Sequence, residues 1–239
     1  MDTAAVVSLS ESDCRKPIAP LWHTLGLFVL FVPSFLTGIY AQRRDTPSGQ
    51  VFPQHAVIFV SVTTLIFHVV LIAYIWWGMR KSGTHIGELI GGSWSSARKV
   101  FTDVSLSFGF LVTVGIVAAL LIRVLGPDHA KGIKGLLPSG RLEVSLWIML
   151  SLSAGFVEEM VFRGYLQAQF VRWGVPAFLA IIAQAVFFGA VHIYKGFNGV
   201  VLGFVFAILA GVLAVWRKSL RPGILGHAVL DMLAIFRRS

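Results

Sequence analysis

Long apolar runs are the feature that most constrains how this chain can fold. Stretches of about 20 mostly apolar residues recur along it, separated by short segments rich in Gly, Pro and charge. Such a run is what an α-helix needs to cross the hydrocarbon core of a bilayer. Of the 239 residues, 56% are hydrophobic and 13% are charged, whereas about 25% are charged in a soluble domain. The chain is therefore not expected to be a soluble globular enzyme, a disordered chain or a disulfide scaffold.

The apolar runs predict an all-α, polytopic transmembrane bundle of about seven helices. We expect a polar N-terminal tail at 1–17 and a single membrane domain at 18–239, in which 18–125 holds the N-terminal spans and 143–236 holds the spans with polar motifs. The predicted spans are 18–41, 55–79, 100–125, 143–171, 175–194, 197–216 and 223–236, with a short interfacial helix between 81 and 99. The last span is short for a full crossing.

The chain is strongly basic, with a formal net charge of +9. On a soluble chain this charge would suggest nucleic acid as a partner. Here the basic residues form pairs at the ends of apolar runs, where they anchor spans at the membrane surface. These pairs are Arg15/Lys16, Arg43/Arg44, Arg80/Lys81, Arg98/Lys99, Arg217/Lys218 and Arg237/Arg238. We therefore expect the lipid bilayer, and no nucleic acid, as a partner.

Six ionisable side chains interrupt the apolar runs of the C-terminal half. They are Glu158, Glu159, Arg163, His192, His227 and Asp231. An ionised side chain at the bilayer midplane costs at least about 2.5–3.5 kcal/mol, so each one invites a functional explanation.

Helical geometry separates the two adjacent glutamates. Glu159 and Arg163 are four residues apart and share a helix face, which predicts an ion pair. Glu158 is rotated by about 100° from Glu159, so it stays free to act as a general base on water. The alternative is a buried structural ion pair with a spare glutamate. His227 and Asp231 are also four apart, and such a pair can stabilise an oxyanion, bind a metal or form a hydrogen bond with each other.

Three motifs follow one another on these apolar segments. They read Glu158-Glu159-Met-Val-Phe-Arg163, Phe188-Gly-Ala-Val-His192 and His227-Ala-Val-Leu-Asp231. In this order they resemble the signature of the CAAX-protease and bacteriocin-processing family, also called CPBP or ABI. The resemblance covers residues 143–236, and the N-terminal spans match only in being apolar.

The resemblance implies a glutamate-type intramembrane endopeptidase, similar to CAAX prenyl proteases, that needs no cofactor or metal. It implies that Glu158 with His192 activates the attacking water and that His227 with Asp231 stabilises the oxyanion. Glu159 and Arg163 would support them. The substrate would be a membrane-associated or lipidated peptide or protein. The compact loops resemble bacterial members, so we expect an integral protein of a bacterial plasma membrane.

The last motif departs from members that process prenylated substrates, many of which carry Asn at this position. An ionised Asp231 only accepts hydrogen bonds, so it would repel an oxyanion. It can still orient His227, or act as a donor when protonated.

Two other functions remain open. A metal-dependent membrane hydrolase could use Glu158, His192 and His227 as zinc ligands. A non-catalytic immunity or scaffold protein could bind a partner through the same polar cluster. His23 and His68 lie outside the motifs, and we interpret them as packing residues.

Overall fold

The computed structural model describes residues 16–43, 56–126 and 138–236, and these residues form helices and no strands. Residues 1–15 of the predicted tail lie outside the described residues. The first half contains α1 (Leu21–Arg43), α2 (Ala56–Ser82), α3 (Ile86–Ile90) and α4 (Ala97–Leu125). The second half contains α5 (Arg141–Glu158), η2 (Glu159–Gln167), α6 (Ala168–Arg172), α7 (Ala177–Val191), η3 (Ile193–Lys195), α8 (Gly196–Arg217), α9 (Arg221–Leu233) and η4 (Ala234–Phe236).

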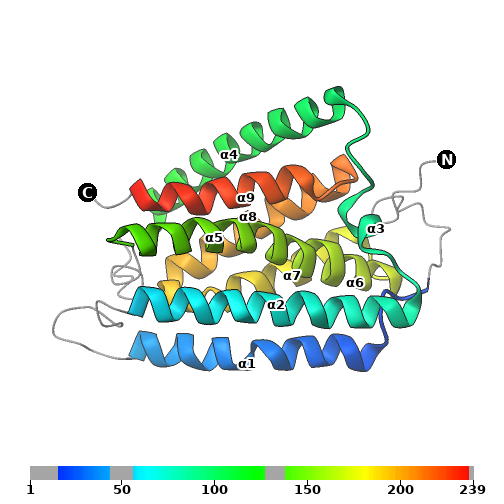
Figure 1. The fold of residues 1–239 in the computed structure, drawn as a ribbon, viewed down its shortest axis with the longest axis horizontal. Coiled ribbons are helices and arrows are strands. Elements are labelled where there is room, and N and C mark those ends of the chain that lie inside the picture. Colours follow the sequence, from blue (N-terminus) through cyan, green and yellow to red (C-terminus); the bar gives the residue numbers. More distant parts are fainter. Residues whose placement is uncertain (1–15, 44–55, 127–137, 237–239) are drawn as a thin grey trace.

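The predicted helical membrane bundle is confirmed. Among the described residues, five helical segments are long and apolar enough to cross a bilayer: Leu21–Tyr40, Val57–Ser82, Ala97–Leu125, Arg141–Arg172 and Ile193–Arg217. Helices α7 and α9 are shorter, with 15 and 13 residues. Both lie alongside the long helices (Figure 1). The five long segments together with α7 and α9 correspond one to one to the seven predicted spans.

The helix that carries the first motif contains a π-helical stretch where a regular α-helix was expected. It runs from Arg141 to Arg172, and its central segment η2 is π-helical over nine residues, all buried. A π-helix is rare, and it often marks a functional site. The stretch begins at Glu159, so it falls directly on the polar motif.

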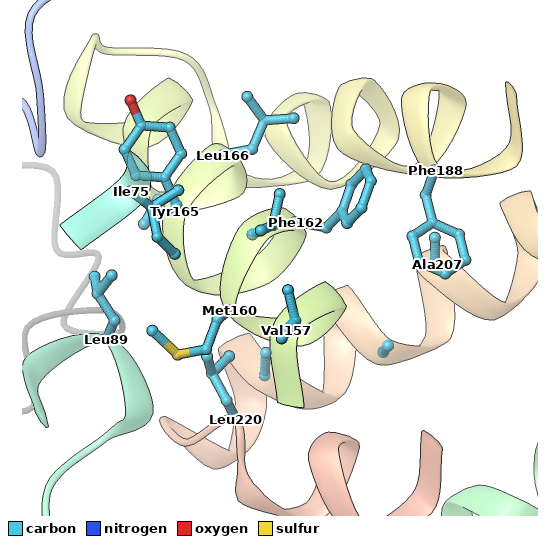
Figure 2. Close-up of a cluster of buried hydrophobic side chains, with 14 of the residues drawn as sticks. Ile75, Leu89, Val157, Met160, Phe162, Tyr165, Leu166, Phe188, Ala207 and Leu220 are labelled. Carbon is cyan, nitrogen blue, oxygen red and sulfur yellow. The ribbon is translucent and has the colours of Figure 1, made fainter. Parts of the chain in front are cut away.

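Several other elements pack around this π-helical stretch. Figure 2 shows side chains of this helix pointing in several directions, toward neighbours on other elements. The labelled neighbours are Ile75 of α2, Leu89 of α3, Phe188 of α7, Ala207 of α8 and Leu220 before α9. All nine residues of η2 are buried, so protein surrounds this segment on every side. The periodicity of apolar residues in the sequence does not reveal a π-helical segment of this kind.

A close approach between α5 and α9 brings the first and third motifs together. A Cβ atom at Gly155 would lie 2.7 Å from the backbone nitrogen of Ala228 and 2.8 Å from the carbonyl oxygen of Ile224. Only glycine permits this spacing, as in other closely packed membrane helices. The indole of Trp147 on α5 also donates to the carbonyl oxygen of Asp231 at 3.0 Å. Helix α9 is thus held in register with α5.

Polar contacts fix the start of α9. The backbone N–H of Leu220 and the hydroxyl of Ser219 donate to the carbonyl of Ile90, at 3.0 and 3.2 Å. The Arg221 guanidinium donates to the carbonyl of Gly92. These contacts tie α9, which carries His227, to the turn after α3.

A buried hydrogen-bond network joins the start of α1 to η2. His23 is fully buried, and its Nε2 lies 2.9 Å from the carbonyl oxygen of Tyr74. A carbonyl only accepts, so Nε2 donates and Nδ1 must accept. The hydroxyl of Tyr165 lies 2.7 Å from Nδ1 and 3.0 Å from the Thr24 hydroxyl. Tyr165 therefore donates to His23, and Thr24 donates to Tyr165.

The substitution Tyr165→Phe is expected to lower the free energy of unfolding by about 1–3 kcal/mol, because it leaves Nδ1 of His23 buried without a donor. Denaturant titration in detergent micelles measures the change. Thr37→Val is the control, because the Thr37 hydroxyl donates to the carbonyl of Pro33 in its own helix at 2.9 Å. Equal stability of the two variants would contradict the assigned network.

Candidate active site

The three motifs lie on three parts of the bundle. Glu158 is the last residue of α5 and Glu159 the first of η2, His192 follows α7, and His227 lies on α9. Packing of α5 against α9, and of α7 against η2, brings these elements together.

The ion pair predicted within the first motif is present. Oε1 of Glu159 lies 3.2 Å from NH1 of Arg163, and the two side chains are 1% and 0% exposed. The same oxygen lies 3.1 Å from Nδ1 of His227. One oxygen of Glu159 thus contacts both the guanidinium cation of Arg163 and the imidazole of His227.

Arg163 is a buried cation held mainly by charge and aromatic rings. No described residue forms a hydrogen bond with its guanidinium nitrogens. Its Cζ lies 4.5 Å from the ring centre of Phe188 and 5.3 Å from that of Phe206. Cation–π contacts of this kind are strongest where water is excluded. Glu159 and these two rings therefore stabilise the charge of Arg163.

His227 lies among three carboxylates. Its Nδ1 donates to Glu159, because an ionised carboxylate only accepts. Its Nε2 lies 3.6 Å from Oδ2 of Asp231 and 3.8 Å from Oε2 of Glu158. Both distances exceed hydrogen-bond length. Nε2 is therefore close to two carboxylates without being bonded to either.

Glu158 has a different environment from its neighbour. Its Oε2 has no hydrogen-bond partner among the described residues, and its side chain is 22% exposed. Asp231 is more open, at 34%. One glutamate of the motif is thus fully engaged, and the other keeps a carboxylate oxygen available at the same site.

The His192 side chain is positioned by the backbone carbonyl and by the aromatic ring of Phe188. Its Nδ1 lies 2.7 Å from the carbonyl oxygen of Phe188, so Nδ1 donates and a neutral ring keeps its lone pair on Nε2. The Phe188 ring centre lies 4.5 Å from that of His192 and 6.1 Å from that of His227. The described residues show no hydrogen bond or ion pair between His192 and Glu158. Close polar contacts thus link the other predicted site residues, and His192 joins them through Phe188.

Two ionisable residues near the site were not predicted to belong to it. His68 of α2 lies within electrostatic range of His227 and Asp231. Lys195 of η3 lies within range of Asp231 and Glu158. Both are ionisable groups at or within apolar runs, which is the signal that could have identified them.

No group of three His, Cys, Asp or Glu side chains in the described ranges is arranged to hold a metal ion. The zinc site predicted as an alternative, at Glu158, His192 and His227, gains no geometric support from these residues. It stays a prediction that chelation would test.

The fold and the site together define a polytopic membrane protein with a buried glutamate, histidine and arginine cluster in its C-terminal half. Residues 140–233 match the Rce1-like family, described as type II CAAX prenyl endopeptidase Rce1-like. This match agrees with the resemblance in the three motifs, all of which lie within it.

The match spans α5 to α9 and includes all three motifs, over about two fifths of the chain. Comparisons with curated proteins and with solved structures found no match. At the level of the family, the chain is related to CAAX-type intramembrane endopeptidases, which are hydrolases.

Proposed function

We propose that this protein is a glutamate-type intramembrane endopeptidase that cleaves a membrane-associated or lipidated peptide or protein, in a bacterial plasma membrane. The observation that carries the proposal is the unequal state of two adjacent glutamates. Glu159 is neutralised by Arg163, whereas the buried Oε2 of Glu158 has no hydrogen-bond partner among the described residues. A partly accessible carboxylate in a water-poor site is suited to act as a general base.

In the proposed reaction, Glu158 takes a proton from a water molecule while the water oxygen attacks the carbonyl carbon of the scissile peptide bond. His192 assists by accepting a hydrogen bond from the same water through Nε2, since its Nδ1 is committed to Phe188. Protonated Glu158 then gives the proton to the leaving amine as the C–N bond breaks. The products are a carboxylic acid and an amine, which become a carboxylate and an ammonium ion by proton transfer.

His227 is the proposed donor to the tetrahedral oxyanion. Its Nδ1–H is held by Glu159, so the ring orientation is fixed. The nearby carboxylates stabilise a doubly protonated ring by charge attraction, and its Nε2–H then donates to the oxyanion. A pre-oriented donor of this kind is often the largest single contribution to catalysis.

The test is a cleavage assay in liposomes with a pool of membrane-extract peptides, read by mass spectrometry. Wild-type protein is compared with Glu158→Gln and His192→Ala. Products that disappear in both variants, while both remain folded, support the proposal. Products common to all three proteins would overturn it in favour of a non-catalytic immunity or scaffold role. Loss of activity on chelation, restored by zinc, would favour the metal-dependent alternative.

Asp231 is proposed to act by orienting His227, so Asp231→Asn is expected to keep kcat within about tenfold of wild type. Asparagine has nearly the same shape, so it keeps the close contact of residue 231 with the His227 ring. Asp231→Ala removes the contact and is expected to lower kcat by a further factor of about ten. Steady-state rates per folded protein measure both effects. Equal rates for the two variants would contradict the orienting role.

A further inference from the structure

A cavity of about 360 Å³, open to the surface of the bundle, lies between α2 and α5. Its walls are mostly apolar and include Ile72, Ala73 and Trp76 of α2 and Val157 of α5. The polar side chains among its lining residues, His68 and Ser153, face each other from the two helices.

His68 and Ser153 form a polar pair across the cavity. Nδ1 of His68 lies 2.8 Å from the Ser153 hydroxyl, and His68 is 4% exposed. Because Nδ1 is occupied, the hydrogen-bonding capacity left on the ring is at Nε2. No described residue forms a hydrogen bond with Nε2. The ring thus keeps one unused donor or acceptor beside an apolar cavity.

One wall of the cavity comes within one residue of the proposed general base. Val157 in its wall directly precedes Glu158 in the chain. His68 also lies within electrostatic range of His227 and Asp231. A peptide segment lying in this cavity would therefore lead toward the proposed general base.

We propose that His68 is a substrate-binding residue whose Nε2 forms a hydrogen bond with a main-chain group of the substrate peptide. The peptide would lie extended in the cavity, with apolar side chains against Ile72, Trp76 and Val157. A main-chain group in a water-poor environment needs a partner, and the His68–Ser153 pair supplies one. The inference rests on the proposed function, because it assigns the substrate of that reaction to this cavity.

The test measures KM and kcat for a fluorescent peptide ending in a CAAX sequence, with and without a prenyl group. Loss of a binding contact that is equal in ground and transition states raises KM and leaves kcat unchanged. For His68→Ala we expect KM to rise about tenfold and kcat to stay within about twofold. His68→Gln keeps a polar group and is expected to recover most of the loss.

Ser151→Ala is the matched control, because the Ser151 hydroxyl donates to the carbonyl of Trp147 in its own helix at 2.8 Å. Ser153→Ala, two residues along α5, is expected to raise KM several-fold, and Ser151→Ala is not. If the pair only packs α2 against α5, His68→Ala will lower the melting temperature and the folded fraction while KM stays constant. That result would overturn the inference.

Binding of the same peptides to Glu158→Gln protein separates the two proposals. Weaker binding in the Glu158→Gln/His68→Ala double variant supports the role of His68, even if the wild-type protein cleaves neither peptide. In that case the proposed reaction fails on these peptides and the binding role survives. Unchanged binding in the double variant overturns the role of His68, whatever the wild-type activity.

Discussion

Glu158→Gln is expected to lower kcat by about 10²–10⁴-fold, the range that general acid–base catalysis contributes. The amide is close to the carboxylate in shape and cannot take the proton from water. Product formation by mass spectrometry, normalised to folded protein, measures the loss. A variant that retains more than about a tenth of the wild-type rate would contradict the role of Glu158 as the base.

The same substitution is expected to leave stability nearly unchanged. Oε2 of Glu158 has no hydrogen-bond partner among the described residues, and the nearest ionic contact, to Nε2 of His227, is 3.8 Å long. Replacing such a carboxylate by an amide removes no hydrogen bond. We expect a change within about 0.5 kcal/mol, as for substitutions away from special features. Loss of activity with the fold intact then separates a chemical role from a structural one.

Much of the architecture could be predicted from the sequence, because a membrane allows few kinds of structure to cross it. A bilayer requires long apolar helices, so the spans could be located from composition alone. The Glu159–Arg163 pair followed from a four-residue spacing, which places side chains on one face. That spacing still brings the two groups to 3.2 Å in the π-helical segment.

The π-helix and the cavity could not be predicted in this way, because both depend on contacts between distant segments. The nine residues of η2 are buried among several other elements, and the sequence pattern gives no sign of their π-helical form. His68 was interpreted as a packing residue, since nothing near it in the sequence shows that α2 faces α5. The 3.1 Å contact between Glu159 and His227 likewise joins residues that are 68 positions apart in the sequence.

Glu159→Gln is expected to act in the opposite way to Glu158→Gln, by destabilising the fold. It removes the carboxylate that compensates Arg163, whose side chain is 0% exposed. Breaking a buried pair by removing one partner costs about 3–5 kcal/mol, because an uncompensated charge stays buried. Denaturant titration in micelles should show this loss for Glu159→Gln, beside a nearly unchanged Glu158→Gln. Two adjacent residues of the same type thus serve as controls for each other.

The double variant Glu159→Gln/Arg163→Met separates charge compensation from packing. Arg163→Met alone leaves Glu159 charged and buried, with His227 as its one remaining polar partner among the described residues, so it is also expected to be destabilising. Removing both charges leaves an amide that still accepts from Nδ1 of His227 and an apolar side chain against Phe188. The double variant should therefore be more stable than the sum of the two single losses, with a coupling energy within the range of about 0.5–3 kcal/mol found for contacting residues. Simple additivity would show that Arg163 acts through its ring contacts, and not through the charge of Glu159.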